Sequence, residues 1–141
     1  MAKKNLEVFM KCSDYTILVA EDEPGLRKVY EKSLSAEGYK LILAESGARA
    51  LAELHETPVD LLITDVKMET MSALELLPII KKDFPILPVI VVSGRYEGFE
   101  EDFHKKGFDN VETFFHKPLK MDVLKQKIRQ ILKIEDGVGK T

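Results

Sequence analysis

Cysteine is nearly absent from this chain of 141 residues, in which Cys12 stands alone. A single thiol cannot form a disulfide within the chain, and without a neighbouring ligand it makes a poor metal site. Long hydrophobic runs are also missing. No apolar stretch approaches the roughly 20 residues that span a bilayer, and the first residues lack the apolar segment of a secretory signal. We therefore expect a cytoplasmic protein that makes no contact with a membrane.

The chain also has no excess of basic residues over acidic ones. Lysine and arginine number 21 against 24 aspartates and glutamates, which gives a net charge of -3. The chain as a whole is therefore not expected to bind nucleic acid electrostatically. Hydrophobic residues make up 45% and charged residues 32%, a balance typical of a soluble globular protein. The length suits one domain. We expect it at residues 14–134, between a tail at 1–13 and a second tail, or the start of a linker, at 135–141.

Short apolar runs are what the chain does have. Most are hydrophobic at nearly every position instead of every second one, which is typical of parallel strands covered on both faces. The predicted strands are Thr16–Ala20, Leu41–Ala44, Leu61–Thr64, Pro88–Ser93 and the less apolar Glu112–His116.

Helical patterns lie between and after these runs. The first follows Pro24 and stops near Gly38, and the third opens with a capping box at Ser72–Glu75 but contains Pro78, which requires a kink or a later start. A pattern at 96–106 is the weakest. The clear apolar faces are Leu26, Val29, Tyr30 and Leu34; Ala50, Leu51 and Leu54; Leu74, Leu77 and Ile80; and Met121, Leu124, Ile128, Ile131 and Leu132.

This alternation of strands and helices predicts an α/β fold. Repeated βα units with right-handed crossovers form an open, five-stranded parallel sheet with helices on both faces, the (βα)5 doubly wound, flavodoxin-like arrangement. In such folds ligands bind at the carboxyl ends of the strands. The residues that follow each predicted strand are therefore the place to look for function.

Polar side chains follow four of the predicted strands. Glu21, Asp22 and Glu23 end the first, Asp65 the third, Ser93 the fourth and Lys117 the fifth. Each alone is an ordinary loop or turn residue. Their joint position at the same edge of one sheet predicts a site that holds carboxylates, a hydroxyl and an ammonium together.

That combination suits phosphoryl transfer. Clustered carboxylates favour a hard cation such as Mg²⁺, which could neutralise an incoming phosphoryl group. An aspartate can accept that group as an aspartyl phosphate. Lys117 would supply positive charge to its oxygens and Ser93 a hydrogen-bond donor, while Gly94 leaves room for its approach.

The order of an acidic pair, a central Asp, Ser-Gly and Lys-Pro resembles the receiver domain of two-component response regulators, including the single-domain chemotaxis regulators. The resemblance runs from about Thr16 to Ile134. It implies the following roles: Asp65 as phosphoacceptor; Asp22 as direct Mg²⁺ ligand, with Glu21 acting through water and the main-chain carbonyl of Lys67 completing the site; Ser93 as switch hydroxyl; Phe114 as aromatic switch; Lys117 as phosphate-binding lysine; and a cis bond before Pro118.

The sequence departs from the family pattern at several positions. Glu21 replaces the commoner Asp, Glu69 the usual Pro, and Ala73 the usual Gly, so a differently shaped loop is expected after Asp65. Phe114 lacks the hydroxyl of the commoner Tyr. By the same resemblance, Lys67 and Arg95 stand where members of the family tune dephosphorylation, and two long cations there predict slow loss of phosphate.

Partners also follow from the resemblance. None of the histidines (His55, His104 and His116) resembles a phosphodonor, so the donor is expected on a sensor histidine kinase or phosphotransfer protein. Phosphorylation would alter a surface made of the fourth helix, the fifth strand and the fifth helix, which could also form a homodimer. The chain is then a switch and not an enzyme, and its output partner is unknown.

Other readings fit less well. A flavin domain needs a Ser/Thr-rich phosphate loop where this chain has AEDEPG, and a dinucleotide domain needs G-x-G-x-x-G. A phosphatase of the haloacid dehalogenase type needs a second Asp at position 67, where the chain has Lys67. The remaining alternative is a receiver-like interaction module that works without phosphorylation.

Overall fold

The computed structural model describes residues 11–68, 70–94 and 110–134. In chain order these contain a short 3₁₀ helix η1 (Cys12–Asp14), β1 (Thr16–Ala20), α2 (Pro24–Ser35), β2 (Lys40–Ala44), α3 (Gly47–Glu56), β3 (Leu61–Asp65), α4 (Ala73–Asp83), β4 (Val89–Ser93), β5 (Val111–His116) and α6 (Met121–Leu132). The first described element thus begins at Cys12.

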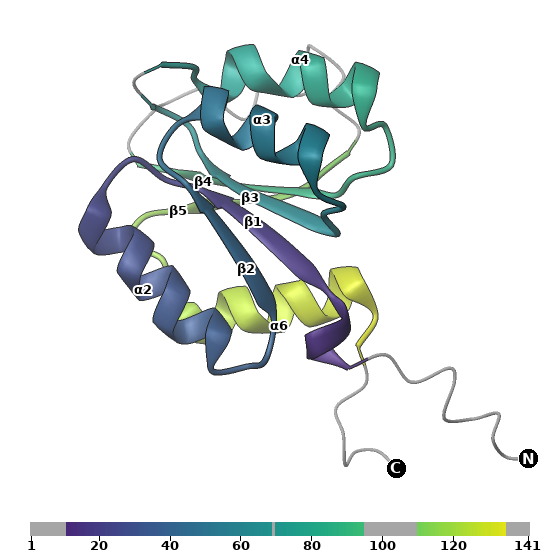
Figure 1. Cartoon of the computed structure of the whole chain (residues 1–141). Coiled ribbons are helices and arrows are strands. Elements are labelled where there is room, and N and C mark those ends of the chain that lie inside the picture. The colour runs from purple at the N-terminus through teal and green to yellow at the C-terminus, as the bar shows by residue number, and fades with distance from the viewer. Residues whose placement is uncertain (1–10, 69, 95–109, 135–141) are drawn as a thin grey trace, which may run out of the picture.

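The five strands form one parallel sheet in the order β2-β1-β3-β4-β5. Helices α3 and α4 cover one face, and α2 and α6 cover the other (Figure 1). The predicted α/β sheet with helices on both faces is therefore confirmed. All five predicted strands are present, and their bounds differ from the predicted ones by one residue at most.

Each face of the sheet carries its own apolar core. Alternate residues of β1 point to opposite sides, so that Leu18 joins a cluster under α3 and α4 while Ile17 and Val19 join one under α2 and α6. Strands β1, β3 and β4 are buried almost throughout. Burial on both faces explains why their sequences are continuously hydrophobic.

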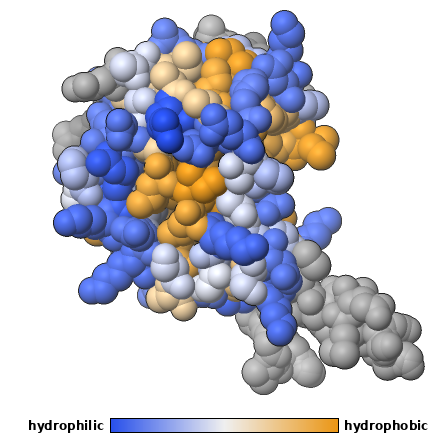
Figure 2. Space-filling model, viewed as in Figure 1, coloured by the Kyte–Doolittle hydropathy of each residue, from blue (hydrophilic) through white to orange (hydrophobic). Residues whose placement is uncertain are grey.

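Strand β2 lies at the edge of the sheet and is less buried. Its residues Leu41, Ile42 and Leu43 are partly exposed, and an apolar strip runs between the two helix layers where this edge faces the viewer (Figure 2). As an edge strand, β2 pairs with a single neighbour in the described sheet, β1.

Helix α4 runs through Pro78 without starting late. The capping box is present, with the Ser72 amide donating to Glu75 Oε1 at 3.0 Å, and the helix begins at Ala73. The proline ring lies on the exposed side. Pro78 has no N–H for the carbonyl of Leu74, but the buried face of the helix outweighs that loss.

Two details of α2 differ from the sequence prediction. Val29 is 44% exposed instead of buried, because Tyr30 and Leu34 already fill the narrow face that meets the sheet. Gly38 has a φ of 105° but lies beyond the C-cap Ala36, so it turns the chain toward β2 after the helix has ended.

The predicted helix at 96–106 lies outside the described residues. Among the described helices, none is long and apolar enough for a membrane span.

Candidate functional site

The acidic residues after β1 differ sharply in burial. The Glu21 amide donates to the Ala44 carbonyl at 2.9 Å and so extends the strand ladder by one step, which directs the Glu21 side chain inward, where it is 1% exposed. Asp22 is more open to solvent, and Glu23 is exposed at the start of α2. The Glu21 Oε2 atom accepts a hydrogen bond from the Glu23 amide at 3.1 Å, so Glu23 contributes through its main chain.

Asp65 is the last residue of β3, and its side chain is 9% exposed. Its Oδ1 accepts a hydrogen bond from the Val66 amide at 2.7 Å. Its Oδ2 accepts one from Lys117 Nζ at 3.0 Å. Both carboxylate oxygens therefore have defined partners, which holds the group at the carboxyl end of the central strand.

Lys117 directly follows β5, which is separated from β3 by β4, and its side chain reaches the Asp65 carboxylate. Its amide donates to the Ser93 carbonyl at 2.8 Å, and the Lys117–Pro118 bond is cis, as the resemblance implies. Its ammonium lies 3.6 Å from Glu21 Oε1 as well as 3.0 Å from Asp65 Oδ2. One cation thus lies between two of the predicted carboxylates.

The charges in this cluster shift one another's protonation. Burial and the neighbouring Asp65 raise the pKa of Glu21 from 4.5 to about 7, although Lys117 opposes the shift. Burial lowers the pKa of the Lys117 ammonium, but its contacts with Asp65 and Glu21 outweigh this and the net shift is upward. The site has more negative charge than its single lysine can balance.

That imbalance fits a bound cation. Glu21, Asp22 and Asp65 each present an oxygen, and these oxygens lie within 4.8 Å of one another. Glu21 Oε1 is buried without a hydrogen-bond partner in the described part of the chain. An all-oxygen set of ligands, one of them a buried carboxylate oxygen that forms no hydrogen bond to the described residues, suits Mg²⁺.

The predicted switch residues lie on the neighbouring strands. Ser93 ends β4, is 1% exposed, and its Oγ has no hydrogen-bond partner among residues 11–68, 70–94 and 110–134. A Cβ built on Gly94 would meet no atom within 4 Å, so space is open there. Phe114 is partly buried on β5 and packs against the core under α3 and α4.

The loop from β3 to α4 holds Lys67, whose side chain is exposed. The Ala73 amide donates to the Val66 carbonyl at 2.9 Å and closes this loop. Its far end contacts the start of α3, where a Cβ on Gly47 would collide with the Met71 carbonyl oxygen. Of the remaining site predictions, Arg95 lies outside the described residues.

Two residues near the site were missed from the sequence. Arg27 Nη1 donates to the carbonyls of Glu21 at 2.8 Å and Asp22 at 3.0 Å and so holds the acidic loop in place. Tyr30 is 1% exposed, and burial raises its pKa, with the charges of Glu21 and Asp65 adding to the shift. Arg27 could have been found from its place in the first turn after Pro24, directly over the acidic loop.

Comparisons with known proteins point to one family. Residues 17–129 match the response regulator receiver domain. The transcriptional regulatory protein GlrR of Escherichia coli is 36% identical over 116 residues, which cover 82% of this chain and 26% of that protein. The heme response regulator HssR of Staphylococcus saprophyticus is 34% identical over 119 residues, or 84% of this chain and 51% of that protein. The chain thus spans about a quarter to a half of these relatives.

Comparison with solved structures points to the same family. A response regulator receiver domain protein from Clostridium thermocellum has 26% identity and a TM-score of 0.75, covering 84% of this chain and 94% of that one. The receiver domain of a signal transduction histidine kinase from Syntrophus aciditrophicus has 27% identity and a TM-score of 0.75, covering 90% and 94%. Since the family match spans β1 through most of α6, this chain belongs to the response regulator receiver domains, the signalling modules of two-component systems.

Proposed function

We propose that this domain accepts a phosphoryl group on Asp65 from a phosphohistidine of a sensor histidine kinase or phosphotransfer protein. The observation that carries the proposal is the position of Lys117 Nζ, 3.0 Å from Asp65 Oδ2 and 3.6 Å from Glu21 Oε1. This ammonium is placed to neutralise charge next to the acceptor oxygen, as phosphoryl transfer requires.

The transfer is a direct exchange of bonds. A carboxylate oxygen of Asp65 forms a bond to phosphorus, and the bond from phosphorus to the ring nitrogen of the donor breaks, with its electron pair staying on that nitrogen. Lys117 donates to an oxygen of the transferred group. Glu21, Asp22, Asp65 and the Lys67 carbonyl would hold Mg²⁺, which supplies charge neutralisation when bound.

The signal would then pass through residues next to the acceptor. The Ser93 hydroxyl, which has no hydrogen-bond partner among the described residues, donates to the phosphoryl group, and Phe114 moves toward the space that Ser93 leaves. The surface formed by the helix predicted at 96–106, β5 and α6 changes its population of conformers, which alters the binding of an output partner or a second copy.

The acceptor assignment is tested by mass. The protein is incubated with Mg²⁺ and an acyl phosphate, and its intact mass is measured. We expect one phosphoryl adduct on the native chain and none on Asp65→Asn. No adduct on the native chain, or one on the variant, would refute the assignment.

The lifetime of the phosphoryl group is a separate prediction. Lys67 is exposed beside the acceptor loop, and Arg95 is expected nearby from the sequence. Two long cations there hinder the approach of hydrolytic water. Lys67→Asn and Arg95→Glu should therefore shorten the half-life of the adduct in a time course of intact mass, and a longer half-life in both variants would contradict this.

A further inference from the structure

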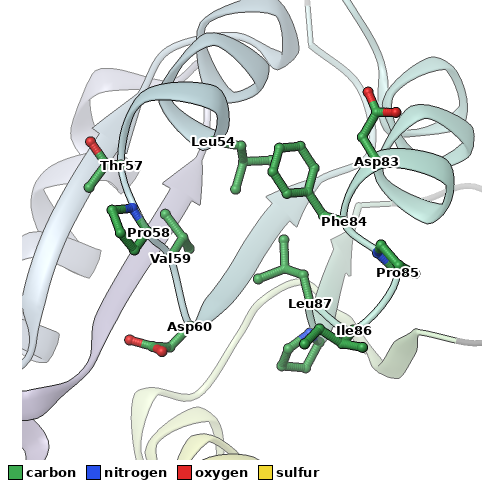
Figure 3. A pocket seen from close by; sticks show the side chains of 11 residues that line it. Leu54, Thr57, Pro58, Val59, Asp60, Asp83, Phe84, Pro85, Ile86 and Leu87 are labelled. Atoms are coloured by element: carbon green, nitrogen blue, oxygen red, sulfur yellow. The ribbon is translucent and has the colours of Figure 1, made fainter.

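The surface hollow shown in Figure 3 lies where strands β3 and β4 begin, at the opposite end of the sheet from the acidic cluster. Its volume is about 410 Å³, its lining is mainly apolar, and Ile86 is 92% exposed beside it. Its two acids already have partners. Asp60 Oδ2 accepts a hydrogen bond from the Thr16 amide at 2.8 Å, and Asp83 Oδ2 lies 3.8 Å from His55 Nε2. A buried polar group that does lack a partner lies elsewhere, beside the single cysteine.

That group is the hydroxyl of Tyr39. The residue directly precedes β2, is 5% exposed and belongs to the core under α2 and α6. Its hydroxyl oxygen forms no hydrogen bond of ordinary length and angle with the described residues. Outside the candidate site, the other such atom in the described part of the chain is Asn110 Oδ1, and that side chain still donates to the Leu87 carbonyl at 3.1 Å. Such atoms are few in folded proteins and often mark a bound group or redox chemistry.

The Cys12 thiol lies beside this hydroxyl. Cys12 is half-buried and packs against the same core. Helix η1 holds it at the turn before β2, where a Cβ on Gly38 would lie 3.5 Å from Cys12 Cβ. Burial raises the pKa of the Tyr39 hydroxyl, and its weak contact with Cys12 adds to the shift, so Tyr39 keeps its proton near neutral pH. Because sulfur is a weak acceptor, this proton has no good acceptor in the reduced protein.

Arg129 adds a positive charge to these surroundings. It lies on α6, and its guanidinium interacts electrostatically with both Cys12 and Tyr39. Its Nη2 donates to Glu37 Oε1 at 3.2 Å, and Glu37 Oε2 lies 3.6 Å from Lys125 Nζ. Because two cations share this one carboxylate, Glu37 does not cancel the positive charge. A hydroxyl that can donate and a guanidinium therefore both lie beside the sulfur, and both would stabilise an oxygen atom bound to it.

We propose that Cys12 is a site of reversible oxidation, at which the Tyr39 hydroxyl and the Arg129 guanidinium stabilise the sulfenic acid. The oxidant is a hydroperoxide. The Cys12 thiolate attacks the terminal oxygen of the hydroperoxide, a sulfur–oxygen bond forms and the oxygen–oxygen bond breaks. The released hydroxide or alkoxide takes up the proton that the thiol lost, so the sulfur is oxidised while the peroxide is reduced to water or an alcohol. The new oxygen then accepts the hydrogen bond from Tyr39.

Thiols reverse the modification. A first thiol forms a mixed disulfide with Cys12 and releases water, and a second thiol displaces the Cys12 thiolate by forming a disulfide with the first. Cys12 lies before β1, whereas the acidic residues follow that strand, so the two sites are at opposite ends of it. The oxidation therefore requires none of the groups that would accept phosphate.

The test follows oxidation of the reduced, unphosphorylated protein. Hydrogen peroxide is added, the sulfenic acid is trapped with dimedone at successive times, and the adduct is quantified by intact mass. We expect an adduct on the native chain and none on Cys12→Ser. We also expect none when the oxidised protein is treated with dithiothreitol before dimedone is added. The proposal is wrong if the native chain forms no adduct, or if dithiothreitol does not prevent it.

Matched tyrosine substitutions assign the stabilising group. Tyr39→Phe removes only a hydroxyl that has no partner among the described residues, so the variant should fold as the native chain does. Its sulfenic acid should disappear at least about threefold faster, because one hydrogen bond is lost. Tyr15→Phe is the control, since Tyr15 packs against the same core but its hydroxyl already donates to the Leu132 carbonyl at 3.1 Å. Equal lifetimes in Tyr39→Phe and the native chain, or equal shortening in the two variants, would overturn the proposal.

Discussion

The surroundings of Glu21 oppose the negative charge of its carboxylate. It ionises near pH 4.5 in an unfolded chain, but burial beside Asp65 raises its pKa to about 7 in the folded, metal-free protein. Between these values the folded state binds more protons than the unfolded state. The stabilising contribution of the protonated group is therefore fully present below pH 4.5 and is lost as the pH rises through 7.

We predict that this loss amounts to roughly 2 kcal/mol of unfolding free energy. Urea unfolding in EDTA at about pH 5 and about pH 8 measures it. Glu21→Gln, which cannot ionise, should remove most of the decline. Glu23→Gln is the matched control, because that neighbour is exposed. If Glu21→Gln declines with pH as steeply as the native protein, Glu21 does not carry the effect.

The three acids after β1 should also differ in function. Asp22 presents an oxygen within the cluster of carboxylates, whereas Glu23 does not belong to that cluster. We predict that Asp22→Ala abolishes Mg²⁺-dependent phosphorylation and that Glu23→Ala leaves it nearly intact, as read from the mass adduct with an acyl phosphate. Equal losses in the two variants would show that the acids act only through their summed charge.

At the scale of elements, the contact between α3 and the β3–α4 loop depends on a glycine. A Cβ at Gly47 would lie 2.9 Å from Met71 Cβ and would also collide with the Met71 carbonyl. Gly47→Ala should lower the unfolding free energy by at least about 2 kcal/mol. Chemical denaturation measures the change.

Gly25 supplies the comparison. It lies in the first turn of α2, and a Cβ there would meet nothing within 4 Å. Gly25→Ala should raise the unfolding free energy by up to about 1 kcal/mol, because alanine loses less backbone entropy in a helix. Similar effects of the two substitutions would mean that the loop moves away from Gly47 at little cost.

Over the whole molecule, the sheet separates two cores. Ile80 of α4 packs on one face, Ile128 of α6 packs on the other, and both are fully buried. Ile80→Val and Ile128→Val should each cost about 0.5–1.5 kcal/mol. The double variant should equal their sum to within about 0.5 kcal/mol, because the sites share no partners. A larger deviation would reveal coupling through the sheet.

Much of the architecture could be predicted from hydrophobic pattern alone. Runs such as Leu61–Thr64 allow almost no other role than a strand covered on both faces, and the helices between them follow from apolar spacing. The boundary at Gly38 and the burial of Val29 were predicted less well. The exposure of Val29 depends on how wide a stripe of α2 meets the sheet, which the local sequence pattern does not contain.

The candidate site also has features that the sequence predicts and features that it does not. The carboxyl ends of parallel strands meet at one edge of the sheet, so the convergence of Glu21, Asp22 and Asp65 could be predicted, and one carboxylate oxygen of each lies within 4.8 Å of the others. The brace that Arg27 provides was not predicted, because it joins a helix side chain to two backbone carbonyls.

The sequence by itself determined the order of strands and helices, the chemical groups at the strand ends and the family, because these depend on residue type and spacing. Only the tertiary structure decided that Glu21 is buried with an oxygen that forms no hydrogen bond to the described residues, that Lys117 contacts both Asp65 and Glu21, and that Ile86 is exposed beside an apolar hollow. Burial, distance and electrostatic coupling arise from segments far apart in the chain, and these exist only once the sheet has brought the segments together.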